Sequence, residues 1–279
     1  MKKISRRSFL AAAGLSVAAL ALTACGGSSA STASSVASSA ASSEAASTSA
    51  AAGELTTVEA GKLTMATNAT FPPYEMTTDA GEFEGIDIET AQAIADKLGL
   101  ELQIDDMDFD AALLSVQQGK ADIVMAGVTV TDERKAVMDF SDSYATGIQS
   151  IIVPEGSDIA SPDDLAGKKI GTQRGTTGYI YCSDDFGEDA VVAYDNGLTA
   201  VQALNNGQVD AVVIDNAPAK EYVAANPGLA ILDTSYAEED YAIGMAKGSS
   251  LEDAVNAALE ELKADGTLQS IVDKYITAE

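Results

Sequence analysis

The 279-residue chain contains no histidine and no tryptophan, and it has only two cysteines. Without imidazole it cannot build a Ser–His–Asp triad or a histidine-based metal site, so enzymes that depend on them are excluded. Basic residues are also scarce: 16 Lys and Arg stand against 43 Asp and Glu, for a formal net charge of -27. A surface with this charge repels phosphate, so we expect no nucleic-acid partner.

Hydrophobic residues make up 46% of the chain, which is enough to form packed cores. The apolar run from Phe9 to Ala24 is shorter than the about 20 residues that a membrane-spanning helix needs. Basic residues precede this run and small residues end it, so residues 1–24 are predicted to be a secretory signal peptide. The sequence Leu22-Thr23-Ala24-Cys25 resembles the bacterial lipobox, in which cleavage leaves Cys25 as a lipidated N-terminus. Ser5 to Leu10 resembles a twin-arginine export signal, and an ordinary basic leader explains its two arginines as well.

Residues 25–54 are predicted to be the lipidated cysteine and a flexible linker. Of the 28 residues from Gly26 to Gly53, 24 are Ser, Ala or Gly, so this stretch cannot bury a core. A flexible chain of this length spans on the order of 30 Å. Removal of the signal peptide changes the net charge from -27 to -31 because it removes four basic residues. With Cys25 lipidated, Cys182 has no partner, and we expect no intramolecular disulfide.

The remainder of the chain alternates short apolar runs with helical patterns, which predicts an α/β fold in two halves. Ser161 and Pro162 predict the start of a further helix, with a serine cap and proline in the first turn. The expected strands are 63–66, 100–104, 123–126, 151–153, 169–171, 191–193 and 211–214, and the expected helices are 86–98, 109–118 and 251–263.

An internal repeat suggests where a ligand would bind. Residues 113–126 and 201–214 each contain a helix, a glycine, a turn with Asp and a buried strand. Ligands of open α/β sheets bind beyond the carboxyl ends of the strands. There the first strand is followed by Gly127, Val128 and Thr129, and the second by Asp215. If the two halves face each other, these ends meet across a cleft.

Two charged residues near these strand ends each have two interpretations. Arg134 follows Thr131, a predicted helix cap, so its cation lies in the first turn, which the helix dipole disfavours. It either grips an anionic carboxylate in bidentate fashion or pairs with Asp132 or Asp139 at the surface. Asp215 either accepts an ammonium group or caps the helix that follows it.

Other motifs do not indicate a cofactor or metal. The glycine-rich turn Gly171 to Gly178 lacks both the dinucleotide fingerprint and the Gly-Lys-Ser/Thr of a P-loop. The acidic stretch Asp105 to Asp110 resembles a calcium loop, but Ala111 and Gln117 stand where an EF-hand starting at Asp106 needs glycine and glutamate.

Several segments in order along the chain resemble the polar amino acid binding proteins of ABC importers, over essentially all of residues 60–276. This resemblance implies a type II periplasmic-binding-protein-like fold, in which each lobe is a mostly parallel sheet flanked by helices. Lobe 1 would be 55–143 plus 244–279 and lobe 2 would be 149–238, joined by hinge strands at 144–148 and 239–243. The segments that carry the resemblance are Ala66–Glu75, Ala126–Arg134, Asp139–Asp142, Gln173–Thr177 and Ile214–Asp215.

The resemblance also implies roles for individual residues. Arg134 would hold the α-carboxylate of the ligand, with the amides of Thr129 and Thr176, and Asp215 would hold the α-ammonium group. The region of Ala126 and Gly127 would assist Asp215, Phe71 and Phe109 would sandwich the ligand side chain, and Asn68 and Gln173 would lie at its polar end. The remaining members of the expected binding set are Tyr74 and Thr177.

The specificity is left open by two departures from the family pattern, one of which is Gln173, where several relatives have a basic residue. Relatives that bind cationic or amide side chains often have Asp where this chain has Asn68, which weakens the expectation of a salt bridge there, although Glu75 could substitute. The expected ligand is a polar amino acid: glutamine, arginine, lysine or cystine.

Together these features predict a monomeric lipoprotein on the outer face of the cell membrane. It would need no cofactor and would deliver an amino acid to ABC permease and ATPase subunits. The alternative is an exported enzyme of the same fold that resembles cyclohexadienyl dehydratases, with Glu75 as its general acid.

Overall fold

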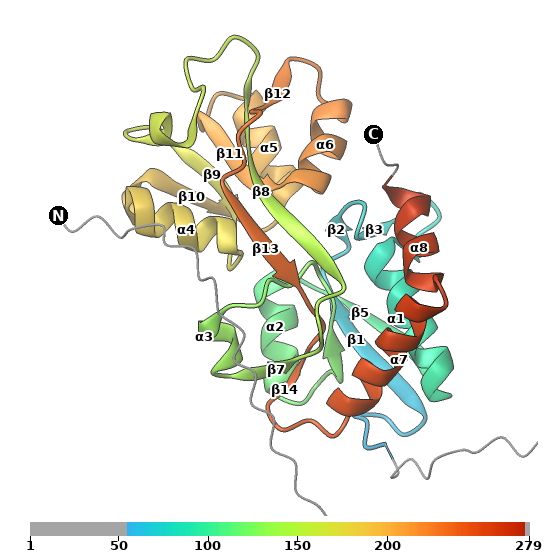
Figure 1. Cartoon of the computed structure of the whole chain (residues 1–279). Helices are drawn as coiled ribbons and strands as arrows, with labels where there is room; N and C mark the ends of the chain where they lie inside the picture. The colour runs from blue at the N-terminus through green and yellow to red at the C-terminus, as the bar shows by residue number, and fades with distance from the viewer. Residues whose placement is uncertain (1–54, 277–279) are drawn as a thin grey trace, which may run out of the picture. The chain divides into compact units, whose positions relative to one another are not determined.

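A computed structural model gives the structure of this chain and describes residues 55–276. The predicted signal peptide, the predicted lipidation site Cys25 and the predicted linker lie outside the described residues. Within residues 55–276, no helix combines the length and apolar character needed to cross a membrane. The described residues form two sheet-based lobes within one compact unit, which confirms the predicted two-lobe α/β fold (Figure 1). Both sheets are mixed and not mostly parallel as expected, because β8 and β14 run antiparallel to their neighbours.

The first lobe is built on a mixed five-stranded sheet. Its strands are β1 (Lys62–Thr67), β5 (Glu101–Asp106), β6 (Ile123–Val124), β7 (Met138–Phe140) and β14 (Gly244–Ala246). They lie in the order β5-β1-β6-β14-β7. β1 runs parallel to β5 and β6, whereas β14 runs antiparallel to both of its neighbours.

Helices cover both faces of this sheet. Leu63 and Met65 on β1 belong to the same core cluster as residues of α1 and α7, whereas Ala66 packs in a separate cluster with α2. This alternation follows from the two-residue period of a strand. The helices of this lobe are α1 (Ile86–Leu98), α2 (Phe109–Gln117), α3 (Asp132–Lys135), α7 (Glu252–Ala264) and α8 (Thr267–Tyr275), and a small sheet is formed by β2 (Thr70–Phe71), β3 (Glu75–Thr77) and β4 (Phe83–Glu84).

The second lobe repeats the mixed arrangement. Its sheet order is β10-β9-β11-β8-β12, with β9 parallel to β10 and β11, and β8 antiparallel to β11 and β12. The strands are β8 (Ala145–Pro154), β9 (Ile170–Gln173), β10 (Val191–Tyr194), β11 (Ala211–Asp215) and β12 (Leu229–Ile231). The helices are α4 (Thr177–Phe186), α5 (Gly197–Asn205) and α6 (Asn216–Ala225), with short 3-10 turns η1 (Pro162–Leu165) and η2 (Glu188–Ala190).

The internal repeat seen in the sequence has the same structural role in both lobes. α2 and β6 form one copy, and α5 and β11 form the other. Asp122 accepts the backbone N–H of Thr64 at 2.8 Å, which fixes the start of its strand to the neighbouring strand β1. Asp210 accepts the backbone N–H of Lys169 at 2.7 Å, next to the start of β9. The two aspartates therefore set equivalent strand positions, so β6 and β11 both end at the cleft.

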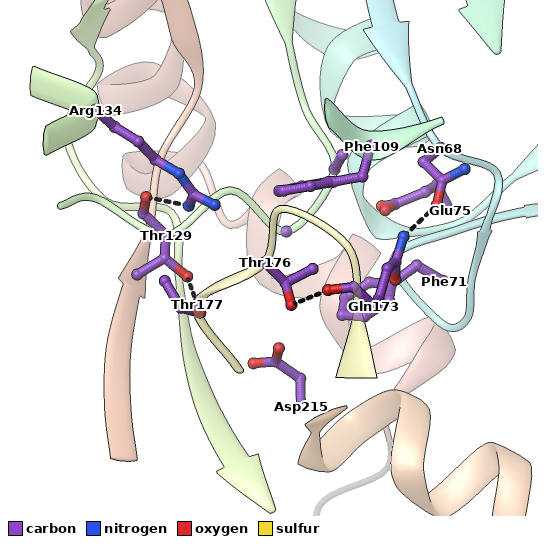
Figure 2. A pocket seen from close by; sticks show the side chains of 12 residues that line it. Asn68, Phe71, Glu75, Phe109, Thr129, Arg134, Gln173, Thr176, Thr177 and Asp215 are labelled. Carbon is purple, nitrogen blue, oxygen red and sulfur yellow. Dashed lines mark hydrogen bonds between the residues drawn. The ribbon is translucent and has the colours of Figure 1, made fainter. Parts of the chain in front are cut away.

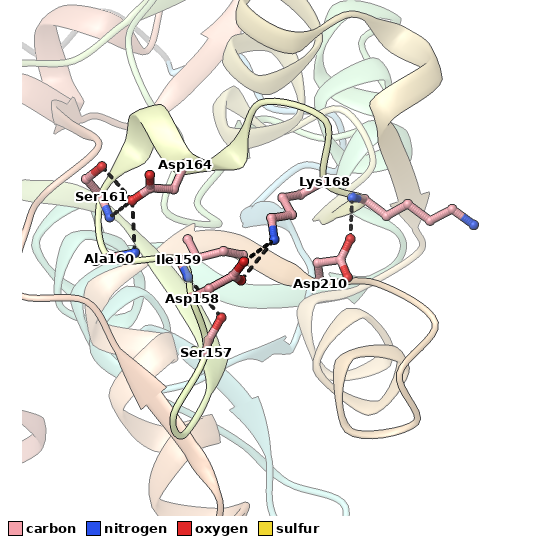
Figure 3. Close-up of polar contacts among 9 residues, drawn as sticks. Ser157, Asp158, Ile159, Ala160, Ser161, Asp164, Lys168 and Asp210 are labelled. Carbon is pink, nitrogen blue, oxygen red and sulfur yellow. Dashed lines mark hydrogen bonds and ion pairs between the residues drawn. The ribbon is translucent and has the colours of Figure 1, made fainter.

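The predicted helix start at Ser161 is present, but the helix is only the single 3-10 turn η1. Figure 3 shows the Asp164 carboxylate accepting the backbone N–H groups of Ala160 and Ser161 and the Ser161 hydroxyl, at 2.9–3.1 Å. Lys168 pairs nearby with Asp158 at 2.9 Å. These contacts stabilise a surface loop and leave the helix no continuation, because Ala166 is extended.

Two strands connect the lobes. β13 (Ala237–Tyr241) pairs antiparallel with β8 from Ala237–Gln149 to Tyr241–Ala145, and both strands lie between the two lobes in Figure 1. Tyr241 is fully buried here, and a Cβ added to Gly147 would lie 2.5 Å from its ring. Only glycine fits at position 147, because the ring of Tyr241 occupies the space that a side chain would need. The exact lobe boundaries within these strands stay a prediction.

Candidate ligand-binding site

A small cavity lies where the strands of the two lobes end. Its free volume is about 10 Å³, which is room for about one water molecule, so the side chains that line it must move apart to admit a larger ligand. Figure 2 shows the side chains that surround it. It is lined by Asn68, Phe71, Glu75, Phe109, Ala126, Gly127, Thr129, Arg134, Gln173, Thr176, Thr177 and Asp215.

The structure therefore brings together 11 of the 12 residues expected from the sequence. Tyr74 is the exception: it lies behind the cavity, where its ring packs edge-on against Tyr241 at a centroid distance of 5.3 Å. Tyr74 lines a second hollow beside β8 and α6 instead. The next residue, Glu75, which begins β3, lines the cavity in place of Tyr74.

Arg134 is held inside the protein, so the interpretation as a surface ion pair was wrong. Its backbone N–H is accepted by the Thr131 hydroxyl at 3.1 Å, which starts α3 and sets the direction of the side chain. The side chain is 8% exposed, while Asp139 pairs with Lys247 at 2.6 Å.

The Arg134 guanidinium donates to the carbonyl oxygens of Thr129 at 2.7 Å and Gly175 at 3.1 Å, so it contacts both lobes. It also lies 5.4 Å from the centre of the Phe109 ring. Burial lowers the pKa of the guanidinium from its ordinary value, and the nearby Glu239 carboxylate opposes that shift. Neutral carbonyls and an aromatic face hold this cation, and its five N–H donors leave capacity for an anion.

Gly127 is required by the close packing around the cavity. Its φ of 55° lies in the left-handed region, and a Cβ would come within 2.9 Å of the Phe71 ring. Its backbone N–H donates to the Asp87 carboxylate at 2.9 Å. Any side chain at this position would push the backbone away from Asp87 and disturb Phe71.

Asp215 ends β11 as a buried carboxyl with one unused oxygen. Its Oδ2 accepts the Gln149 amide at 2.7 Å, whereas its Oδ1 has no hydrogen-bond partner. The side chain makes no capping bond to α6, so the capping interpretation was wrong. Burial raises the pKa of this carboxyl to about 7, and Glu239 adds to the rise. A buried carboxyl with an open acceptor is suited to bind an ammonium group.

The sequence did not single out Glu239 and Gln149, which join the site to the crossing strands. The Glu239 Oε2 accepts the Gln149 amide at 3.0 Å, the Thr129 hydroxyl at 3.1 Å and the Thr177 hydroxyl at 3.0 Å. One carboxylate thus bonds hydroxyls from both lobes. No motif marks Glu239, because it lies among other acidic residues of β13 and its burial depends on the pairing with β8.

The amide side chains of Asn68 and Gln173 contact each other across the cleft. The Gln173 amide donates to the Asn68 carbonyl at 2.9 Å (Figure 2). The Asn68 amide donates to the Met107 carbonyl at 2.9 Å. Thr176 donates its hydroxyl to the Gln173 carbonyl at 2.8 Å, which fixes the turn before α4. These amides can exchange their mutual bond for bonds to a polar ligand group.

The charges around the cavity are unbalanced. Among the described residues that line it, Arg134 is the only base, whereas Asp215 and Glu75 both contribute carboxyl groups. The Glu75 side chain is fully buried, and neither of its oxygens has a hydrogen-bond donor. Across the part of the chain that the structure describes, no group of His, Cys, Asp or Glu side chains is arranged to hold a metal ion.

The comparisons with known proteins identify the family to which this chain is similar. The model of a family described as bacterial extracellular solute-binding proteins, family 3, matches residues 63–278. The chain is 33% identical to a probable histidine-binding protein of Neisseria gonorrhoeae, covering 96% of this chain and 95% of that protein. It is 34% identical to the L-cystine-binding protein TcyJ of Escherichia coli K12, covering 79% of this chain and 85% of that protein.

A solved structure gives the same result for the fold. The arginine-, lysine-, histidine-binding protein ArtJ of Geobacillus stearothermophilus superimposes with a TM-score of 0.75 at 34% identity, covering 78% of this chain and 96% of that one. These relatives are all described as proteins that bind amino acids, and none is described as an enzyme.

Proposed function

The chain belongs to family 3 of the bacterial extracellular solute-binding proteins, and we propose that it binds one free polar amino acid and delivers it to an ABC importer. The observation that carries this proposal is the pair of buried opposite charges in one cavity. Arg134 follows β6 of the first lobe, and Asp215 ends β11 of the second. An amino acid is a zwitterion and presents a carboxylate and an ammonium group together, so it matches both partners.

In this proposal Arg134 binds the α-carboxylate together with the backbone amides of Thr129 and Thr176. The guanidinium already has neutral partners only, so a carboxylate adds the counter-charge that it lacks. The Asp215 Oδ1, which has no donor, accepts the α-ammonium group, assisted by the backbone of Ala126 and Gly127. Ligand binding thereby neutralises two buried charges that are costly when left unpaired.

Phe71 and Phe109 would enclose the ligand side chain, because both rings are buried in the cavity wall. Asn68 and Gln173 would bind its polar end after giving up their mutual bond. The ligand remains a polar amino acid, with glutamine, arginine, lysine and cystine as the leading candidates. Support comes from relatives named for the binding of histidine, cystine, arginine and lysine.

The proposed mechanism is closure of the lobes about the crossing strands. A ligand that touches Arg134 on one lobe and Asp215 on the other binds the closed form better than the open form, so it shifts the population toward closure. Glu239 supports this step because it accepts the hydroxyls of Thr129 and Thr177, one from each lobe. The permease would then recognise the closed form.

The remaining parts of the proposal concern the cellular setting. Export by the leader at 1–24, lipidation at Cys25 and the linker to residue 54 would place a monomeric domain beside its permease and ATPase partners. Replacing Cys25 with serine should release the protein from the membrane fraction into the medium or the periplasm. If the variant pellets with membranes as completely as the parent, the lipid anchor is refuted.

A thermal-shift screen tests the binding function. The mature protein is heated with each of the twenty amino acids, with cystine and with ornithine. A ligand that binds only the native state at 1,000 times its dissociation constant stabilises it by about 4 kcal/mol, which is a shift of several degrees. We expect a positive shift with at least one polar amino acid, whereas no shift with any of them would refute the proposal.

A further inference from the structure

Glu75 and Asp87 form a buried pair of acids against the wall of the ligand cavity. Both side chains are fully buried. The Asp87 backbone N–H donates to the Tyr74 carbonyl at 2.8 Å, which places the first turn of α1 against β3, where Glu75 lies. The Asp87 charge acts on the Glu75 carboxyl and raises its pKa, and Glu75 also lines the cavity. Two carboxylates in such a place cannot both carry a charge without a cation beside them.

No cation of the described residues is placed to compensate Glu75. Arg134 lines the same cavity, but its guanidinium donates to the carbonyls of Thr129 and Gly175. The titratable groups that face Glu75 are acids and phenols from every element packed around it: Asp87, Asp106, Asp215, Tyr74, Tyr144 and Tyr222. The pair must therefore hold a proton at neutral pH.

The proton belongs to Glu75. The Asp87 Oδ2 accepts the backbone N–H of Gly127 at 2.9 Å, and Asp87 lies in the first turn of the 13-residue helix α1, where the dipole favours an anion. Neither oxygen of Glu75 accepts a donor from the protein. Burial and the Asp87 charge raise the pKa of Glu75 well above its ordinary value, whereas the pKa of Asp87 rises only to about 6.

We propose that Glu75 is a proton-carrying subsite for the ligand side chain, so that a cationic side chain displaces the proton and a neutral amide does not. This rests on the proposed amino-acid function and names its ligand class: basic amino acids, with a guanidinium or ammonium tip. When such a ligand binds, the O–H bond of Glu75 breaks, the proton passes to the solvent, and the carboxylate pairs with the ligand cation. Glutamine would meet the neutral acid and leave the proton in place.

Asp215 also titrates, but its effect is common to all amino acids. Its pKa lies at about 7, and every α-ammonium group favours its charged form, so each ligand draws some proton from it. A comparison of arginine with glutamine cancels this contribution. What remains is the proton that Glu75 loses to arginine alone.

The test is calorimetry of arginine and glutamine binding between pH 6 and 8, in phosphate and in Tris. These buffers differ in ionisation enthalpy, so the difference in heat counts the protons released. We expect arginine to release up to one proton more than glutamine. The ratio of their dissociation constants should then shift toward arginine by up to about tenfold per pH unit as the pH rises.

Variants assign the proton to its residue. Glu75→Gln should either bind arginine without releasing the extra proton or no longer bind arginine while it still binds glutamine. Glu82→Gln is the control, because Glu82 is exposed just before β4, and it should behave as the parent. If Glu75→Gln unfolds, Asp87→Asn places an amide donor beside Glu75, which should ionise Glu75 without a ligand and remove the release.

Equal proton counts for arginine and glutamine, or an unchanged count in Glu75→Gln, would overturn the proposal. Binding of neutral amino acids only would overturn it as well and leave the proposed amino-acid function intact. Failure to bind any amino acid would instead refute that function, and this inference with it.

Discussion

Replacing Arg134 with alanine should abolish useful ligand binding. Arg134 is 8% exposed, and its guanidinium donates to two backbone carbonyls at 2.7 and 3.1 Å. Among the described residues, no carboxylate forms a salt bridge with it. A ligand carboxylate would therefore supply its charge partner. Truncating one member of such a buried charge pair costs about 2–5 kcal/mol, which raises the dissociation constant by roughly 30- to 4,000-fold.

Calorimetry with the amino acid found by the thermal-shift screen measures this loss. Arg134→Lys should fall between the parent and Arg134→Ala, because lysine keeps the charge and loses the bidentate fork. Arg174→Ala is the matched control: Arg174 lies in the turn after β9, is largely exposed and pairs with Asp195 only at 3.7 Å. Its loss should change binding by less than about 0.5 kcal/mol.

The reasoning is refuted if Arg134→Ala binds as tightly as the parent, or if Arg174→Ala loses as much as Arg134→Ala. Circular dichroism melts of each variant separate lost binding from lost folding. A folded Arg134→Ala protein without affinity supports the assigned role.

Three further predictions concern the same site and its surroundings. Asp215→Asn should weaken binding of free amino acids and spare analogues without the α-amine, and equal losses for both ligands would contradict the role of Asp215. Gly147→Ala should lower the free energy of unfolding by about 1–3 kcal/mol in urea titrations, because its Cβ would lie 2.5 Å from the Tyr241 ring, and an unchanged midpoint would show that the ring can move aside. The ligand-free protein should lose stability as the pH rises, because the raised pKa values of Glu75, Asp87 and Asp215 make the folded state bind more protons than the unfolded chain. Between about pH 4 and 7, Asp215→Asn should reduce the change of the free energy of unfolding with pH by up to about 1.4 kcal/mol per pH unit. If urea titrations show the same pH dependence in this variant as in the parent, the raised pKa of Asp215 is contradicted.

Much of the fold could be predicted because local patterns and tertiary packing agree. The stripe on Ile86–Leu98 ended by Gly99 gave the bounds of α1 correctly, since Gly99 adopts a φ of 68° as a helix stop. The strand at 63–66 was found because β1 is buried on both faces. The repeat of helix, glycine, aspartate and strand placed β6 and β11 correctly.

Elements without a strong local pattern were missed. α8 was not expected, since its apolar residues Leu268 and Ile271 follow directly on α7 with only a short turn between them. The small sheet of β2, β3 and β4 consists of strands of two or three residues, which are too short to show alternation. η1 has the start signals of a helix, but nothing in those signals sets its length.

The cavity lining was predicted well where strand ends position it and poorly where it depends on packing across the lobes. Arg134 and Asp215 follow strand ends, so their approximate place came from topology, although two interpretations stayed open until burial was known. Tyr74 and Glu75 are adjacent on the chain, and only the turn of β3 decides which of them faces the cavity. Glu239 could not be found, because its partners Thr129 and Thr177 come from different lobes.

The most direct measurement is a crystal structure of the mature protein grown with its amino acid. The account predicts one ligand between the lobes, with its α-carboxylate on the Arg134 guanidinium and its α-ammonium group on the Asp215 carboxyl. A ligand bound elsewhere, or bound here without contact to both side chains, would contradict it.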